Sequence, residues 1–276
     1  MNVSNVGRGA RHLSKDQLVW LARAGYASRG VVYLIIGVFA LFAAIGSGET
    51  QGSKGALEKL MSQPAGTILI VAMIVGLIGY IVWRLIQAIG DADNHGTSVK
   101  GLIVRASLLV SAATYTTLAI FAAAQLGVLS GGGEGSGGGV AETLAGFVGS
   151  QWVATGLSVI FVGIGIAHWY KALTGKFKKY FAASADKVAI IAPISVVGLC
   201  ARGTIFWILA FMLFYRGLTA GEEGGSTPGI KDALNFIQDL PLGDVLLGVM
   251  AVGIAIFAVY SFCEAIWREV DIEEGL

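Results

Sequence analysis

The chain has 276 residues and a formal net charge of +1, and 55% of its residues are hydrophobic while only 13% are charged. A soluble domain averages about 45–50% apolar and about 25% charged residues. Too few ions are present here to cover a water-exposed surface, so the composition excludes an ordinary soluble protein and indicates a polytopic membrane protein. A net charge near zero also gives no support to nucleic-acid binding.

A membrane-spanning helix needs about 20 mostly apolar residues. Six segments meet this requirement, and they are residues 26–45, 67–89, 102–126, 152–172, 190–215 and 243–267. Pro193 lies early in the fifth segment and is expected to break or kink the helix there. A capping-box pattern at Ser14 predicts a short interfacial helix that leads into the first span. The sequence therefore predicts an all-α protein with six transmembrane helices.

The segments that connect the spans alternate in composition. Those after the first, third and fifth spans are rich in glycine and acids, and their only basic residues are Lys54, Lys59, Arg216 and Lys231. The other side holds the remaining 15 of the 19 basic residues, including the cluster Lys171, Lys176, Lys178 and Lys179. By the positive-inside rule, we expect both termini to be cytoplasmic. The lysine cluster sets this topology, and attraction of anionic lipid is the alternative that stays open.

An internal repeat is visible at the start of the odd-numbered spans. The stretch "GYASRGVVY" at 25–33 aligns with "GLCARGTIF" at 198–206, so that Arg29 matches Arg202. The middle copy, "RASLLVSAATY" at 105–115, is weaker because Ser111 takes the place of the arginine. The even-numbered spans repeat as well, in "GLIGYIVWRLIQAI", "GIGIAHWYKALTGK" and "GIAIFAVYSFCEAI".

Each repeat unit reads as a span, a glycine-rich outer loop, a short amphipathic helix and a second span. The three amphipathic stretches are "ALEKLMSQPAG", "AETLAGFVGS" and "DALNFIQDLPLG". Two spans per unit give all three units one orientation, which predicts parallel repeats in a pseudo-threefold bundle, although a row of hairpins stays open. The resulting division is a cytoplasmic segment 1–17, repeats 18–95, 96–182 and 183–268, and an acidic tail 269–276.

The arginine-glycine-aromatic motif, tripled over two-span units, resembles the bacterial family of domain of unknown function 1206 (DUF1206). The resemblance extends from about Leu18 to Trp267, and it is specific in the first and third copies and degenerate in the second. It implies a six-span protein with three repeats in a bacterial inner (plasma) membrane, and it implies no activity. The mitochondrial carriers also have three two-span repeats, but their proline-acid-basic motif is absent, so only the architecture is comparable.

Four arginines lie toward the cytoplasmic ends of odd-numbered spans: Arg23, Arg29, Arg105 and Arg202. Arg29 lies about one turn inside the apolar limit, which is within reach of water for a long side chain. One interpretation is an interfacial anchor, and another is a ring of cations at the inner mouth of a passage. We favour a structural role, in which these arginines cap or pair within the bundle.

Glu264 is the one acid well inside an apolar run of the sequence. Gln87 and Thr174 occupy the equivalent positions of the first and second repeats. Because an uncompensated carboxylate in such a place neutralises or finds a cation, we expect Glu264 to pair with Arg202, or with Arg29 across the closure of the repeats.

The remaining polar candidates within the spans are Ser111 and His168. Ser111 belongs to a helical stripe of hydroxyl residues that hydrogen-bond neighbouring helices, with a wet cavity as the alternative. His168 is the one histidine in a span, which favours a hydrogen-bonding role over that of a ligand. The sequence offers no catalytic constellation, no metal-ligand spacing and no motif for a cofactor.

Three classes of function remain. The favoured one is a non-catalytic scaffold or accessory protein that binds membrane lipid or other membrane proteins, because intramembrane charges are scarce and small residues abundant. The alternative is a small-solute or anion channel or carrier that uses the pseudo-threefold centre. A membrane enzyme is the least favoured, and we expect none.

Overall fold

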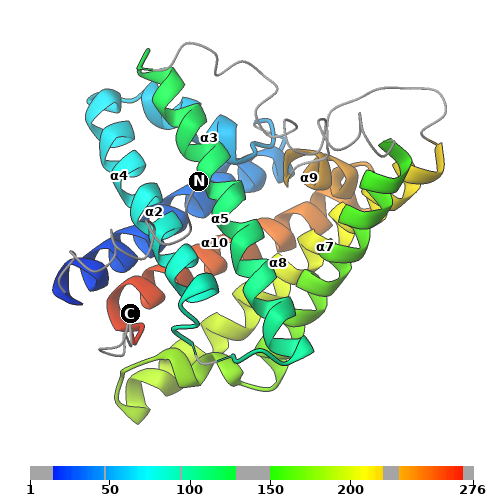
Figure 1. The fold of residues 1–276 in the computed structure, drawn as a ribbon. Coiled ribbons are helices and arrows are strands. Elements are labelled where there is room, and N and C mark those ends of the chain that lie inside the picture. Colours follow the sequence, from blue (N-terminus) through cyan, green and yellow to red (C-terminus); the bar gives the residue numbers. More distant parts are fainter. Residues whose placement is uncertain (1–14, 47, 94, 129–149, 220–229, 270–276) are drawn as a thin grey trace.

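The computed structural model describes residues 15–46, 48–93, 95–128, 150–219 and 230–269 (Figure 1). Its long helices are α2 (Lys15–Ala44), α4 (Gly66–Ile89), α5 (Val99–Gln125), α7 (Ser150–Leu173), α8 (Ala185–Thr219) and α10 (Gly243–Trp267). All six are long and apolar enough to cross a membrane. This result confirms the predicted all-α class and the six spans.

Two short helices lie outside the spans of the first and third repeats, as predicted. They are α3 (Ser53–Met61) and α9 (Ile230–Gln238), and each buries one apolar face against the bundle. Each is followed by a residue in the left-handed region, Ala65 at φ 63° and Leu242 at φ 60°, which turns the chain into the next span. The corresponding stretch of the middle repeat lies outside the described residues. A further 3₁₀ turn, η1 (Lys176–Tyr180), follows α7.

Two local expectations need correction. The helix α8 continues through Pro193, so the expected break is absent, and Ile191 and Leu199 on either side are buried. A proline removes one backbone hydrogen bond, and this packing compensates for the loss. The helix α2 runs without interruption from Lys15 into the first span, so the helix expected to start here is continuous with that span. The cap expected at Ser14 lies outside the described residues.

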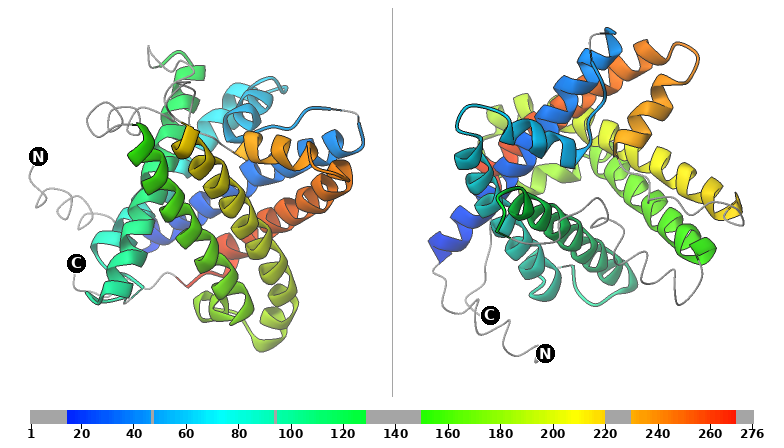
Figure 2. Two further views of the ribbon diagram at one scale, coloured as in Figure 1. Left: turned by 90° about the vertical axis from the view of Figure 1, so that its right-hand side faces the viewer. Right: turned by 90° about the horizontal axis from the view of Figure 1, so that it is seen from above.

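The helices pack in the spatial order α5, α4, α2, α10, α8, α7. Figure 2 shows α2 and α10 running together through the middle, with α4 and α5 on one side and α7 and α8 on the other. The two spans of the first repeat pack together, and so do those of the third, whereas α5 and α7 share no extensive contact in the described part of the chain. The pseudo-threefold closure therefore stays a prediction.

The first and third repeats agree in how closely their two spans approach each other. A Cβ added at Gly25 would lie 2.5 Å from the Cα of Tyr80, and one added at Gly198 would lie 2.7 Å from the Cα of Phe257. These four residues are equivalent pairs in the repeat alignment. Glycine at both places lets the backbones of two antiparallel helices come into contact, which is how small residues serve membrane bundles.

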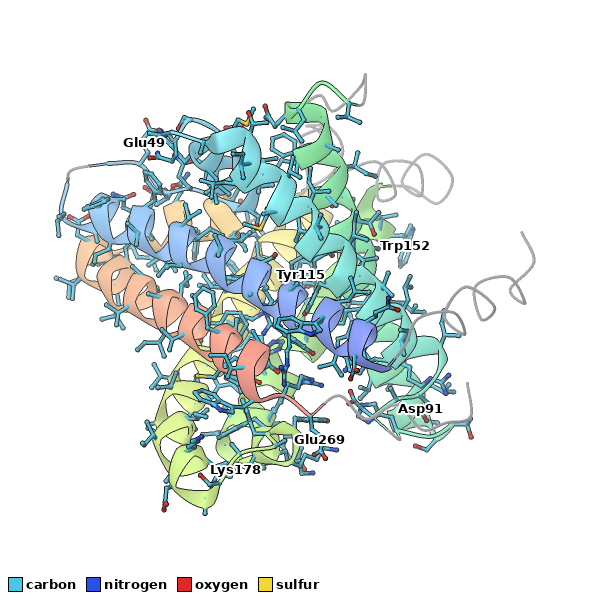
Figure 3. The ribbon with its side chains drawn as sticks, turned by 90° about the vertical axis from the view of Figure 1, so that its left-hand side faces the viewer. Glu49, Asp91, Tyr115, Trp152, Lys178 and Glu269 are labelled. Carbon is cyan, nitrogen blue, oxygen red and sulfur yellow. The ribbon has the colours of Figure 1, made fainter. Side chains whose placement is uncertain are left out.

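Aromatic side chains fill the space between the helices. The ring of Tyr115 from α5 meets that of Tyr80 from α4, with the centroids 4.6 Å apart. Tyr33 and Phe257 make a similar edge-to-face contact at 4.9 Å between α2 and α10. Tyr115 lies among densely packed side chains in the middle of the bundle (Figure 3). Such pairs add directional packing to simple burial.

We expect Gly198→Ala to lower the thermal unfolding temperature of the detergent-purified protein. The new methyl would press on the backbone of Phe257, and overpacking of this kind costs about 1–3 kcal/mol. The matched control is Gly163→Ala, where nothing lies within 4 Å of the added Cβ and stability should be equal or slightly higher. An unchanged melting temperature for Gly198→Ala would contradict this close contact.

Candidate functional site

Arg29 is buried between three helices and has a partner for each of its nitrogens. On α2 it is only 4% exposed, which argues against the interpretation as an interfacial anchor. Its Nε donates to Ser261 Oγ at 3.1 Å and its Nη1 donates to Tyr80 Oη at 3.0 Å. Its Nη2 forms an ion pair with the Glu264 carboxylate. Of the two partners predicted for Glu264, the structure therefore has Arg29, and this one side chain joins α2 to α4 and α10.

The hydrogen bonds continue from Glu264 past the end of α10. The second carboxylate oxygen of Glu264 accepts a bond of 2.8 Å from Nη1 of Arg268, one helical turn further on. The other terminal nitrogen of Arg268 lies 3.5 Å from Oδ2 of Asp93, in the segment after α4. One carboxylate thus bridges two guanidinium groups, which is the arrangement that lets buried charges of like sign coexist.

Residues at the end of α4 complete a closed loop of hydrogen bonds and ion pairs. Nε2 of Gln87 donates to Asp93 at 2.7 Å, and Oε1 of Gln87 accepts a bond of 2.9 Å from Nη1 of Arg84. The other end of the Arg84 guanidinium donates to the hydroxyl of Tyr80, which also accepts from Arg29. We call this closed set the arginine network, and its members are Arg29, Tyr80, Arg84, Gln87, Asp93, Glu264 and Arg268.

The ring of Tyr26 lies among the three guanidinium groups of the network. Its centroid is 5.0 Å from the Cζ of Arg29, 5.8 Å from that of Arg84 and 5.2 Å from that of Arg268. The hydroxyl of Tyr26 accepts a bond of 3.0 Å from the indole of Trp83. Cation–π attraction in a desolvated site reaches about 2 kcal/mol, so this ring offsets part of the repulsion between the arginines.

Beyond the ends of the spans, the pKa values of Arg268 and His95 shift because of burial and neighbouring charge. Burial alone would lower the pKa of Arg268, but Tyr26, Glu264 and Asp93 raise it above its ordinary value, so the side chain stays cationic. Burial lowers the pKa of His95, against the attraction of Asp93 3.9 Å away. His95 therefore favours its neutral form in the folded state, and the contribution of this group to stability weakens as the pH falls below about 6.5.

Arg202, the repeat equivalent of Arg29, has a different environment. Its Cζ lies 4.9 Å from the ring centroid of Tyr33, 5.4 Å from that of Phe206 and 4.7 Å from that of Phe257. Its Nε and Nη1 are fully buried and have no hydrogen-bond partner among the described residues. No described carboxylate pairs with it. The two repeat-related arginines are therefore equivalent in sequence and different in chemistry.

The other two arginines of the sequence set lie outside the network. Arg105 caps the end of α4, where its Nε donates to Ala88 O at 2.7 Å and its Nη2 to Ile89 O at 3.0 Å. This is a common role for a cation at a helix C-terminus. Arg23 is half-buried, and its Nε has no acceptor in the described ranges. The interpretation of the four arginines as a ring of cations at one mouth stays untested.

The remaining two candidates, His168 and Ser111, are not members of the arginine network. His168 on α7 holds Ile164 O with its Nδ1 at 2.8 Å, and its ring lies against Phe206 with the centroids 5.5 Å apart. Ser111 is half-buried on α5. Of the eight candidates, Arg29, Gln87 and Glu264 belong to the network, while Arg202 and His168 meet at the ring of Phe206.

Sequence reasoning missed the members at the helix ends. Arg84 and Arg268 had been counted only toward the topology of the chain. A local signal was available, because Arg268 follows Glu264 and Arg84 follows Tyr80 by four residues, and side chains at this spacing meet on one helix face. Within the described ranges, no group of three histidines, cysteines or acids is placed to hold a metal ion.

Comparison with known proteins gives a family for this arrangement. The family model described as Domain of Unknown Function (DUF1206) matches residues 24–91 and again 197–268, so that each match contains one arginine motif and the span that follows it. The chain belongs to the DUF1206 family. It is also 30% identical over 277 residues to the "Uncharacterized protein YxxB" of Bacillus subtilis (strain 168), across 96% of this chain and 98% of the relative. No solved structure matches the chain.

For this DUF1206 protein, Glu264→Gln should cause a large loss of stability. The amide keeps the shape of the side chain but leaves Arg29 and Arg268 without their shared counter-charge. Breaking one partner of a buried ion pair costs about 3–5 kcal/mol. The measurement is the thermal unfolding temperature in detergent, with Glu58→Gln on the exposed face of α3 as the matched control. Wild-type stability in Glu264→Gln would refute the role of this pair.

The coupling between the two partners can be measured separately. We expect the double variant Arg29→Gln with Glu264→Gln to lose less stability than the sum of the two single variants, because each single variant leaves a buried charge uncompensated. A double-mutant cycle from unfolding temperatures tests this expectation. Strict additivity would mean that the two side chains do not interact energetically.

Proposed function

We propose that this protein is a non-catalytic scaffold or accessory subunit of the bacterial inner membrane that binds another membrane protein through α7. The observation that carries the proposal is the burial of the spans. Only 11% of the apolar segment of α7 is buried within the chain, against 28–44% for the other five spans. A transmembrane helix with so little contact in its own fold has surface left for a partner.

The exposed face of α7 suits a helix better than it suits lipid alone. Nothing lies within 4 Å of a Cβ added at Gly156 or at Gly163, so both glycines face open space. They lie seven residues apart, which places them on one side of the helix. Glycines in this position let a second backbone approach closely, and such contacts drive association where the hydrophobic effect is absent.

An apolar groove continues this face toward α8. It is lined by Val159, Val162, Ile166, Trp207, Phe211 and Phe214. The stacked rings of Trp169 and Trp207, with centroids 5.4 Å apart, hold the two helices together beside it. A groove that two rigidly packed helices form is a surface on which a partner helix can dock without reorganising the fold.

The filled centre favours this function over the alternative of an anion channel or carrier. Aromatic rings from α2, α4, α5, α8 and α10 pack across the middle of the bundle, and the arginine network ties α2, α4 and α10 to one another. Alternating access needs repeats that rock against each other around a central site. Buried ion pairs between the repeats oppose such motion.

The charge distribution supports an orientation with both termini in the cytoplasm. Lys178, Glu269 and Asp91 lie at one end of the bundle and Glu49 at the other (Figure 3). The lysine cluster at the end of α7 and in η1 therefore shares its end of the bundle with the last described residues of the chain. By the positive-inside rule, this end faces the cytoplasm.

The proposal predicts a partner whose binding depends on α7. Gly163→Phe should abolish stoichiometric co-purification of that partner from gently solubilised membranes of the native host, because a large ring occupies the space of the second helix. The matched control is Ala72→Phe, on the exposed face of α4, which should retain the partner. Both variants should keep the wild-type unfolding temperature. A partner profile that Gly163→Phe leaves unchanged would overturn the proposal.

A further inference from the structure

The lysine cluster lies where two candidate spans reach the boundary of the membrane. The span in α7 ends at Leu173 and the span in α8 begins at Ala185, and η1 lies between them. From Lys171 to Lys187 the chain has five lysines and one acid, Asp186, which is a formal net charge of +4. Residues that directly flank a span lie at the depth of the lipid headgroups. This segment therefore presents a strong positive charge to the headgroup layer.

Packing and backbone hydrogen bonds hold the segment against the bundle. Phe177, in the middle of η1, is only 1% exposed. The backbone nitrogen of Ala182 donates to Trp267 O at 2.8 Å, and that of Glu269 donates to Tyr180 O at 2.9 Å. These bonds join the segment after α7 to the end of α10. The lysines thus project from a backbone of fixed conformation.

Aromatic rings lie beside three of the ammonium groups. The Nζ of Lys176 lies 4.6 Å from the ring centroid of Tyr170 and donates to its hydroxyl at 2.7 Å. The Nζ atoms of Lys171 and Lys179 lie 4.8 Å and 4.6 Å from the ring centroid of Tyr180. An aromatic ring attracts a cation but carries no net charge. These contacts therefore position the lysines without neutralising them.

No carboxylate in the described part of the chain lies within ion-pair distance of these lysines. The ion pairs between described residues have Arg29, Arg268 or His95 as the cation. Four of the five lysines are exposed, and they are Lys176, Lys178, Lys179 and Lys187. Lys178 lies at one end of the bundle, beyond the long helices (Figure 3). The charge of these four side chains is therefore available to an anion from outside the chain.

The apolar surface beside the lysines favours a lipid over a soluble anion or an acidic protein. Leu173, just before η1, and Ile190, early in α8, are both 69% exposed. Surface of this kind contacts acyl chains, while a long lysine side chain beside it reaches the headgroup. Clusters of four to eight basic residues directly outside a membrane helix attract anionic lipids.

We propose that the lysine cluster, with Lys187, binds the phosphates of anionic phospholipids in the leaflet at this end of the bundle. The ammonium groups of Lys176, Lys178 and Lys179 contact the phosphate oxygens. The positive-inside rule depends on the number of basic residues and requires no particular conformation of the loop. The packed turn and its aromatic contacts go beyond that requirement, and a lipid site gives them a role.

This inference goes beyond the scaffold function and does not rest on it. The scaffold proposal depends on the exposed face of α7 at Gly163, whereas the lipid site lies at the end of α7 and in η1. The variant Gly163→Phe should therefore bind anionic lipid as the wild type does. Failure of either proposal leaves the other standing.

The test is the unfolding temperature of the detergent-purified full-length protein during titration with phosphatidylglycerol. Phosphatidylcholine with the same acyl chains is the control lipid, because its headgroup has a phosphate but no net charge. A ligand that binds only the folded state raises the unfolding temperature, so phosphatidylglycerol should raise it more than phosphatidylcholine does. A triple variant with Lys176→Gln, Lys178→Gln and Lys179→Gln should show a rise of about tenfold or more in the apparent dissociation constant for phosphatidylglycerol, since each lysine near an anionic surface contributes about fivefold.

A matched control removes three lysines from the other end of the bundle, where α3 and α9 lie (Figure 1). It combines Lys54→Gln, Lys59→Gln and Lys231→Gln, and the first two of these lysines also lie over aromatic rings. This variant should respond to phosphatidylglycerol as the wild type does. The cluster variant keeps 12 of the 15 basic residues on its side of the membrane, so its orientation and its unfolding temperature without lipid should be those of the wild type.

Replacing the same three cluster lysines by arginine keeps the charge and should preserve the response to phosphatidylglycerol, because a guanidinium also donates to phosphate oxygens. Three results would overturn the proposal. They are a shift in the wild type that is no larger with phosphatidylglycerol than with phosphatidylcholine, an equal response in the two triple glutamine variants, and an equal shift with inorganic phosphate at the same ionic strength, which would identify a site for soluble anions.

Discussion

The ion pair between Arg29 and Glu264 joins the first membrane helix to the last. Both charges are almost completely buried, so the pair contributes stability only because every nitrogen of Arg29 has an acceptor. Those acceptors come from α4 and α10, which means that three helices must be in place before the charge is satisfied. Partly satisfied networks of this kind are unstable, and the cost of an incomplete one selects a single packing of the helices.

The first and third repeats differ in the side chains that surround their equivalent arginines. Arg29 meets an acid, whereas Arg202 faces Phe257, the counterpart of the Tyr80 that Arg29 contacts. In the middle repeat the arginine itself is absent, and Ser111 takes its place. Equivalent backbone positions thus hold an arginine whose nitrogens all have hydrogen-bond acceptors in the first repeat, and in the third an arginine with two nitrogens that have none among the described residues.

Hydropathy was enough to predict the spans, because about 20 apolar residues in a row have few alternatives to a membrane helix. The helices themselves run further, as when α8 begins at Ala185 instead of residue 190, since helical hydrogen bonding continues past the apolar limit. The partner of Glu264 was not decidable, because Arg29 and Arg202 lie in the same local motif. Only the packing of α2 against α10, which joins residues more than 230 positions apart, selects Arg29.

The helices at the two ends of the packing order have one neighbouring span each, and this determines where the molecule can interact. The α2 and α10 spans have neighbouring spans on both sides, and their side chains form the arginine network and much of the aromatic core. By contrast, α7 packs against α8 alone among the spans with extensive contacts, and glycines face outward from it. Charge is thereby kept in the rigid interior while close-packing surface is left at the periphery. That division is the basis for our proposal that a second membrane helix binds at α7, since the least buried span has contacts to gain.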